Sequence, residues 1–110
     1  MSYKFEEIWC NKGNFTERNR KSSEIDTLVI HYTGNNGDTA ENNGNYFKNN
    51  VVETSAHYFV DDTTVVRSVA DKNIAWHAGY WDINCRSIGI EIAGSTTECT
   101  GKTLENVILL

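Results

Sequence analysis

The chain has 110 residues and a mass of 12.4 kDa, which is room for a single domain over residues 1–110 around one hydrophobic core. Apolar residues make up 39% of the sequence, which is too many for an intrinsically disordered protein. Ten basic against fifteen acidic residues give a net charge of −5. Without a basic patch, this balance argues against nucleic-acid binding and against a polybasic membrane anchor.

The N-terminus has neither the basic nor the apolar region of a secretory signal. No apolar run reaches the ~20 residues that a membrane-spanning helix needs. We therefore expect synthesis in the cytoplasm and no membrane insertion. Cys10, Cys85 and Cys99 form no CxxC pair, so free thiols are expected, with a Cys85–Cys99 bridge as the alternative.

The first part of the chain is expected to hold one irregular segment, one strand and one helix. Residues 1–23 are polar and should wrap the surface, anchored by Ile8 and Trp9. The apolar run in residues 25–31 indicates a buried strand, followed by a loop over 32–37. Asp38 or Thr39 then caps a helix from Ala40 to about Asn50, and Gly44 lowers its regularity.

The second part is expected to be mainly strands. Residues 56–60 and 65–69 should form a hairpin, because the four residues between them are turn formers. Residues 71–86 read as irregular. Residues 87–93 indicate a strand with three isoleucines on one face and Gly89 and Glu91 on the other. Residues 103–110 open a helix with an apolar stripe that stops at the last residue, so we expect the domain to continue further.

Three positions suggest chemistry. His31 stands at a strand end, a rigid mount for an imidazole, although such histidines are often structural. Trp76 and His77 lie in a stretch without periodicity and suit contacts to sugar or peptide; a tryptophan that fills the core is the alternative. Glu91 is costly on an apolar strand unless it is paired, lies in a cleft or is functional. Its alternative is an edge-strand glutamate facing water.

The order of four motifs is more informative than any one residue. The motifs are His-Tyr-Thr-Gly from His31, Ser-Ala-His-Tyr-Phe-Val-Asp-Asp from Ser55, Trp-His-Ala-Gly from Trp76 and Ser-Ile-Gly-Ile-Glu-Ile from Ser87. Together they resemble the type-2 N-acetylmuramoyl-L-alanine amidases over about residues 25–94. This family includes phage endolysins, autolysins and peptidoglycan recognition proteins.

The resemblance implies an α/β fold with a central mixed β-sheet flanked by helices. It also implies one Zn²⁺ in a surface groove and cleavage of the amide between N-acetylmuramic acid and L-alanine in bacterial peptidoglycan. Such an enzyme acts on the cell wall. Chemically, zinc would lower the pKa of a bound water, and a carboxylate would take the water's proton.

Individual roles follow from the same resemblance. His31 matches the first zinc ligand, Glu91 the general base or transition-state stabiliser, and Trp76 and His77 the substrate-contacting groove. His57 matches a structural position, and Tyr58 should point to the opposite face from it. Two further zinc ligands have no match in this chain, so it is expected to be a C-terminally truncated domain. A site made of His31, His57 and His77 is the alternative arrangement.

Two other functions are compatible with the sequence. One is a peptidoglycan-binding module that keeps the groove and lacks the metal. The other is a different small metallohydrolase acting on peptides, which is the weaker hypothesis because the sequence has no HExxH motif.

Overall fold

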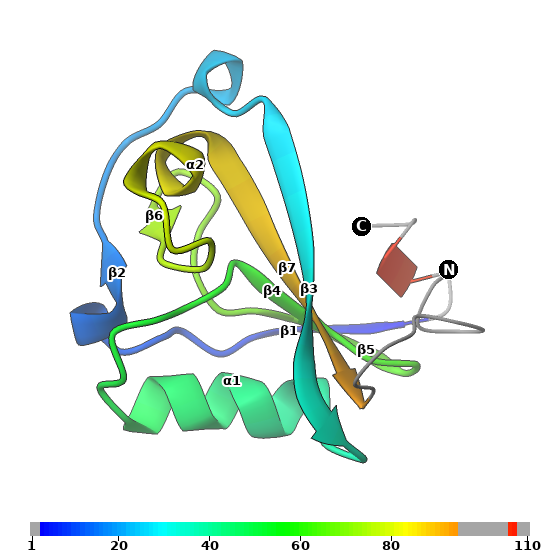
Figure 1. Cartoon of the computed structure of the whole chain (residues 1–110). Helices are drawn as coiled ribbons and strands as arrows, with labels where there is room; N and C mark the ends of the chain where they lie inside the picture. The colour runs from blue at the N-terminus through cyan, green and yellow to red at the C-terminus, as the bar shows by residue number, and fades with distance from the viewer. Residues whose placement is uncertain (1–2, 95–105, 108–110) are drawn as a thin grey trace.

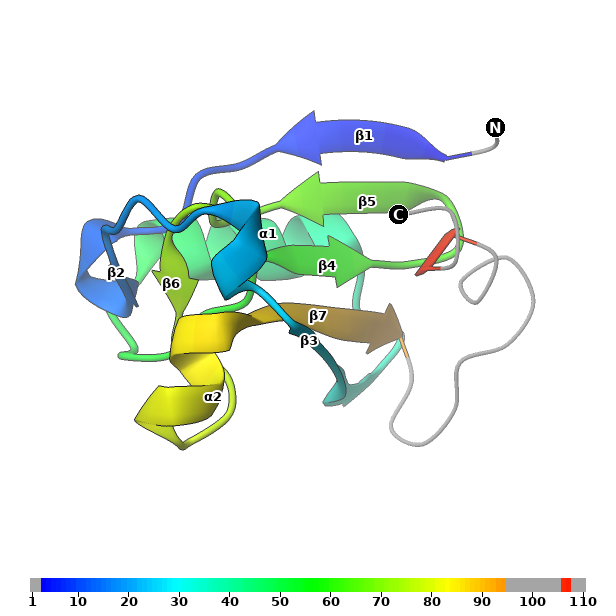
Figure 2. The same ribbon diagram turned by 90° about the horizontal axis from the view of Figure 1, so that it is seen from above.

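A five-stranded mixed sheet forms the centre of the molecule (Figures 1 and 2). The computed structural model describes residues 3–94 and 106–107. The strands lie in the order β1-β5-β4-β7-β3, with bounds Lys4–Glu7, Thr64–Arg67, Tyr58–Val60, Ser87–Gly94 and Thr27–Asn36. Only the β4–β5 pair is antiparallel; the other three pairs are parallel. The expected α/β fold with a mixed sheet is confirmed.

The predicted hairpin is confirmed as β4 and β5, in which Phe59 pairs with Val66. Its turn is held by the Asp61 carboxylate, which accepts hydrogen bonds from the N–H groups of Thr63 and Thr64. The second oxygen of Asp61 accepts the N–H of Ala40 at 2.8 Å. One buried carboxylate therefore joins the hairpin turn to the first turn of the helix that follows β3.

That helix, α1 (Ala40–Asn49), begins where the sequence predicted. The Thr39 hydroxyl caps it by accepting the N–H of Asn42 at 3.0 Å. Gly44 faces the sheet, and a Cβ there would lie 2.9 Å from a methyl of Val66. This glycine thus permits a close approach of helix to sheet. Figure 1 shows α1 lying across one face of the sheet, and in Figure 2, which is seen from above, α1 lies behind the sheet.

Strand β3 corrects two predictions. It lies at the edge of the sheet, and the alternate residues Leu28 and Ile30 are 68% and 50% exposed, so the prediction of a fully buried strand is wrong. The side chains of Leu28 and Ile30 share one face of this edge strand, and no described residue covers that face. The loop predicted over 32–37 is also wrong, because β3 continues to Asn36 with a shift of register after Tyr32.

The segments predicted as irregular contain short elements. Residues 1–23 include β1, two 3₁₀ turns (Lys12–Asn14 and Ser22–Glu24) and β2 (Phe15–Thr16), which pairs with β6 (Ile74–Ala75). Residues 71–86 also contain α2 (Trp81–Arg86). Elements of two to six residues are too short to show a period. Ile8 packs against the core beneath α1 as expected, whereas Trp9 is 48% exposed.

The sheet has an apolar core on each face. On the face that α1 covers, Phe47 stacks on Phe59 at 5.3 Å between ring centroids. On the other face Tyr58, Val60, Val65, Ile88 and Ile90 form a cluster against which Val107 packs. Asn106 and Val107 are helical; the rest of the helix predicted over 103–110 lies outside the described residues.

The prediction of free thiols is confirmed for the two cysteines that the structure describes. Cys10 is a free thiol buried in the core beside Val69 and Ala75, and Cys85 is a free thiol in α2. Cys99, and with it the alternative bridge, lies outside the described residues.

Arg20 holds together the segments that lead into β7. Its side chain is buried, and its guanidinium donates to the carbonyl oxygens of Asp71 (2.7 Å), Cys85 (3.0 Å) and Ser87 (2.9 Å). These carbonyls belong to the loop after β5, to α2 and to the first residue of β7. Buried carbonyls need donors, and one planar guanidinium supplies all three here.

We predict that Arg20→Met lowers the free energy of unfolding by about 3 kcal/mol, because methionine fills the space but leaves these carbonyls without donors. Urea unfolding would measure the change. Lys72→Met is the matched control, since Lys72 is exposed and should change stability by less than about 0.5 kcal/mol. Equal stability of the two variants would contradict the role given to Arg20.

Candidate active site

The parallel pairing of β3 with β7 places His31 beside Glu91. The two residues are direct partners in the register, so their side chains project from the same face of the sheet. Phe59 of β4 is the partner of Glu91 on its other side, and this is the face that α1 covers. Two of the predicted functional residues, 60 positions apart in the sequence, therefore lie together.

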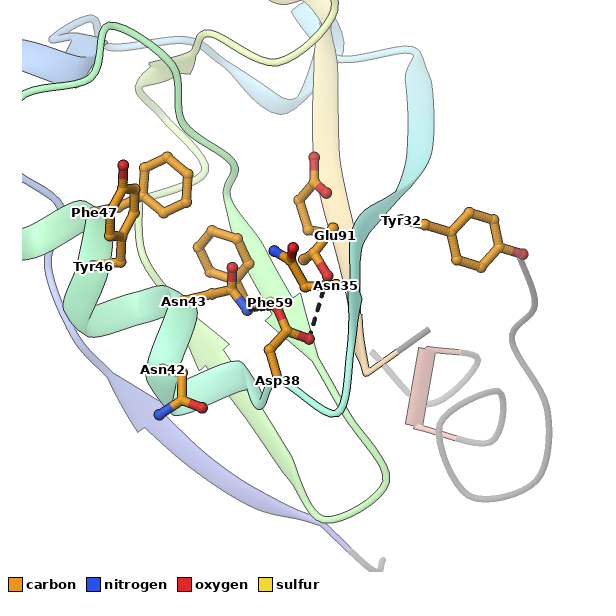
Figure 3. A pocket seen from close by; sticks show the side chains of 10 residues that line it. Tyr32, Asn35, Asp38, Asn42, Asn43, Tyr46, Phe47, Phe59 and Glu91 are labelled. Carbon is orange, nitrogen blue, oxygen red and sulfur yellow. Dashed lines mark hydrogen bonds between the residues drawn. The ribbon is translucent and has the colours of Figure 1, made fainter. Parts of the chain in front are cut away.

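Glu91 lines a pocket of about 600 Å³ between α1 and the ends of β3 and β7 (Figure 3). Figure 3 shows Asp38, Asn43 and Phe59 close to it on the same side, whereas the Tyr32 ring points away from the pocket. The lining is mostly polar and aromatic: Tyr32, Thr33, Asn35, Asp38, Asn42, Asn43, Tyr46, Phe47, Phe59 and Glu91.

Burial, and after it the negative charge of Asp38, raise the pKa of Glu91 to about 7. Asp38 is itself fixed, because its carboxylate accepts from Asn43 Nδ2 at 2.7 Å, from the Thr33 hydroxyl and from the N–H of Gly94. Since β7 lies between two other strands, the alternative of an edge-strand glutamate facing water is wrong. Glu91 is a pocket carboxyl that gains and loses its proton near neutral pH.

His31 lies between Glu91 and a second histidine. Its Nε2 is 3.2 Å from Nδ1 of His77, and the two rings meet edge to face. Burial lowers the pKa of His31, which favours the neutral imidazole. Within the part of the chain that the structure describes, Nδ1 of His31 makes no hydrogen bond.

Trp76 and His77 line a second pocket of about 380 Å³, together with Glu53, Thr54, Gly79, Trp81 and Asn84. Trp76 is half-buried and its indole N–H donates to the Thr16 hydroxyl at 2.9 Å, so it does not simply fill the core. Glu53 has a positive φ of 58°, which is strained for a residue with a side chain. The predicted sugar- or peptide-contacting residues thus border a real concavity.

The His77 ring is tightly enclosed. Its Nε2 lies 2.9 Å from the Ser87 hydroxyl, and a Cβ at Gly89 would come within 2.6 Å of the ring. The absence of a side chain at Gly89 therefore makes room for this ring. Burial lowers the pKa of His77 to about 4, and its charged form is further disfavoured by His31, His57 and Arg20.

His57 is structural. It is fully buried, its Nδ1 accepts the N–H of Gly89 at 3.1 Å, and its Nε2 lies 2.8 Å from the carbonyl of Asn73. Because Nδ1 accepts, the proton is on Nε2 and donates to Asn73, so neither nitrogen is free. Burial lowers its pKa to about 4. The arrangement in which His31, His57 and His77 share a metal is therefore wrong.

Tyr58 points to the opposite face from His57, as predicted, and its hydroxyl donates to Asp71 at 2.6 Å.

A zinc site is only partly represented here. A catalytic zinc has three protein ligands and one open position. Among residues 3–94 and 106–107, no group of three or more His, Cys, Asp or Glu is placed to hold a metal. His31 offers one nitrogen, and it lies within β3 rather than at the predicted strand end, because β3 continues to Asn36. The described residues alone do not fit a zinc ion.

Sequence reasoning missed Asp38 and Ser87 as parts of the site. Asp38 was considered only as a helix cap, and nothing in the sequence indicates that it reaches Gly94 at the end of β7. Ser87 was read as the first residue of a strand, and its contact with His77 depends on how the loop before α2 folds back. Both contacts are tertiary, so no local pattern reports them.

Comparison with known proteins identifies the family. The profile described as Amidase_2, N-acetylmuramoyl-L-alanine amidase, matches residues 21–110. The chain belongs to this family. It is 32% identical over 98 residues to the N-acetylmuramoyl-L-alanine amidase CwlA of Bacillus subtilis, a match covering 86% of this chain and 36% of CwlA. It is 36% identical over 66 residues to the amidase BlyA of the same species, covering 60% of this chain and 18% of BlyA.

Solved structures agree. A mutant endolysin from Bacillus subtilis superimposes with a TM-score of 0.79 at 26% identity, covering 96% of this chain and 70% of that one. The catalytic domain of XlyA gives 0.77 at 28% identity, covering 94% and 70%. Among the described residues, no helix has the length and apolar character needed to cross a membrane.

Glu91 should make stability depend on pH. Its pKa is raised in the folded state, so its stabilising contribution is complete below about pH 4.5 and is lost as pH rises towards about 7. We expect the free energy of unfolding of the wild type, relative to Glu91→Gln, to fall over this range and then level off. Urea unfolding at pH 4.5, 6 and 8 measures it, with Glu17→Gln as the exposed control. A difference that stays constant with pH would contradict the buried state of Glu91.

Proposed function

We propose that this domain hydrolyses the amide between N-acetylmuramic acid and L-alanine in bacterial peptidoglycan, with Glu91 as the general base. Family membership supports the reaction, and the position of Glu91 supports the role. A general base works best when its pKa is close to the operating pH, and burial brings the pKa of Glu91 to about 7. This carboxyl in a polar pocket is the observation that carries the proposal.

Zinc dependence is part of the proposal, with His31 as the first ligand, and is supported by the family together with the pairing of His31 with Glu91 across β3 and β7. Zinc in such enzymes activates water and polarises the scissile carbonyl. The remaining ligands would come from outside the described residues.

The two pockets suggest how the substrate would lie. The pocket at Glu91 is lined by amide side chains from α1, which suit the backbone of a stem peptide. The pocket at Trp76 carries two tryptophans, which suit the apolar face of a sugar ring. His31 lies between Glu91 of the first pocket and His77 of the second pocket. The scissile amide would then lie at His31, between the two pockets.

The direct test is release of new free amines from purified peptidoglycan, with added zinc and with a chelator. Amine release that the chelator stops, without new reducing sugar ends, is the expected result. Binding to the wall without any release would instead favour the non-catalytic binding module. Release of reducing ends would contradict the amide as the bond cleaved.

Glu91→Gln should lower the rate of amine release at least about 100-fold, because the amide cannot accept the proton, while wall binding in a pull-down stays unchanged. Glu17→Gln changes an exposed acid that is in the lining of neither pocket, so it is the control and should keep the wild-type rate. Near-normal turnover of the Glu91 variant would rule out its catalytic role.

A further inference from the structure

Glu53 has an unusual backbone conformation. Its φ is 58°, and it is the only residue other than glycine, among those the structure describes, with a positive φ. A long side chain in this conformation costs free energy, and such strained residues cluster at ligand sites. Glu53 is exposed and lines the pocket of Trp76 and Trp81, so the strain lies beside a concavity.

A buried asparagine holds Glu53 in this conformation. Asn14 is fully buried, and its side-chain oxygen accepts the N–H groups of Val52 at 2.7 Å and of Glu53 at 2.9 Å. Its side-chain nitrogen donates to the carbonyls of Phe47 and Asn50 at the end of α1. Because both hydrogens and both lone pairs of this amide are used, one side chain fixes the loop from α1 to Glu53.

Most other polar groups of this pocket are already used within the protein. The Thr54 hydroxyl donates to the carbonyl of Trp76, and the indole N–H of Trp76 donates to Thr16. The side-chain oxygen of Asn84 accepts two backbone N–H groups. The Glu53 carboxylate makes no hydrogen bond or ion pair with any residue that the structure describes. It is the charged group of the lining that remains available to a ligand.

The surroundings of this carboxylate favour a neutral ligand. A carboxylate only accepts hydrogens, so it binds hydroxyl, amide or ammonium groups. The guanidinium of Arg18 lies 5.9 Å from the centre of the Trp81 ring, and its positive charge would repel an ammonium group there. Two tryptophan rings suit the apolar face of a sugar, of which the hydroxyls lie at the edge. The combination fits a sugar ring better than a cationic side chain.

We propose that Glu53 is a specificity-determining residue for the glycan of the substrate, because its carboxylate accepts a hydroxyl hydrogen from a sugar that stacks on Trp76 or Trp81. The identity of this sugar as part of peptidoglycan rests on the proposed function. The backbone strain then has a use, since it keeps the carboxylate beside the two tryptophans at the expense of stability. Glu53 takes no part in the cleavage itself.

Binding of the β-1,4-linked trimer of N-acetylglucosamine tests the proposal, because this probe carries sugar hydroxyls but no peptide and no ammonium group. In a ¹H–¹⁵N NMR titration of the metal-free chain, the indole signals of Trp76 and Trp81 should shift. The signal of Trp9, which lines neither pocket, should not. No shift of the two pocket signals would overturn the proposal. Since no bond is cleaved, this result is distinct from a failure of amine release.

Glu53→Gln keeps the shape of the side chain and removes its charge, so the trimer should bind about tenfold more weakly. Glu7→Gln, which changes an exposed acid of β1 outside both pockets, is the matched control and should bind as the wild type does. Equal affinity of the two variants would overturn the role of Glu53. A Glu53→Gln variant that loses affinity for a lysine-containing stem peptide, but not for the trimer, would overturn it too.

Glu53→Asn separates the ligand role from a structural one. Asparagine adopts a positive φ more readily than glutamate, so this variant should unfold at a urea concentration about 0.5 M higher than the wild type. Its shorter, uncharged side chain should still bind the trimer about tenfold more weakly. A variant that is no more stable than the wild type, or that binds the trimer equally tightly, would contradict the proposal.

Discussion

The site depends above all on the parallel pairing of β3 with β7. This register makes His31 and Glu91 direct neighbours, and a slip of one residue would send Glu91 to the opposite face, among Ile88 and Ile90. Such a slip would cost free energy, because it would place a carboxylate where the core now holds buried isoleucines. Core packing on one face of the sheet thus fixes the register that places Glu91 in the pocket on the other face.

Buried polar side chains connect this sheet to its surroundings. Arg20 donates to the carbonyl of Ser87, the first residue of β7. His57, just before β4, accepts the N–H of Gly89 in β7. Asp38, just before α1, accepts the N–H of Gly94 at the other end of β7. Every one of these bonds fixes β7, the strand that carries Glu91. An active-site base needs a rigid mount, and here polar bonds at three points along one strand provide it.

The sequence predicted the elements that have a clear period or a turn signal: the hairpin, α1 and the alternating face of β7. Four motifs in order also indicated the family, to which the chain belongs. It did not predict that Leu28 and Ile30 lie on an edge strand, since an apolar run looks the same wherever the strand sits in the sheet. The contact between Ser87 and His77 and the charge of Asp38 beside Glu91 join distant segments of the chain, which no local pattern reports.

The central claim is that folding raises the pKa of the Glu91 carboxyl from its ordinary value to about 7. A ¹³C NMR titration of the Glu91 side-chain carboxyl measures this directly, using Glu91→Gln to assign the signal. The structure predicts a midpoint at about pH 7, raised by burial and by Asp38. A midpoint near the ordinary glutamate value of about 4.3 would contradict the account, because Glu91 would then be solvated and outside a catalytic pocket.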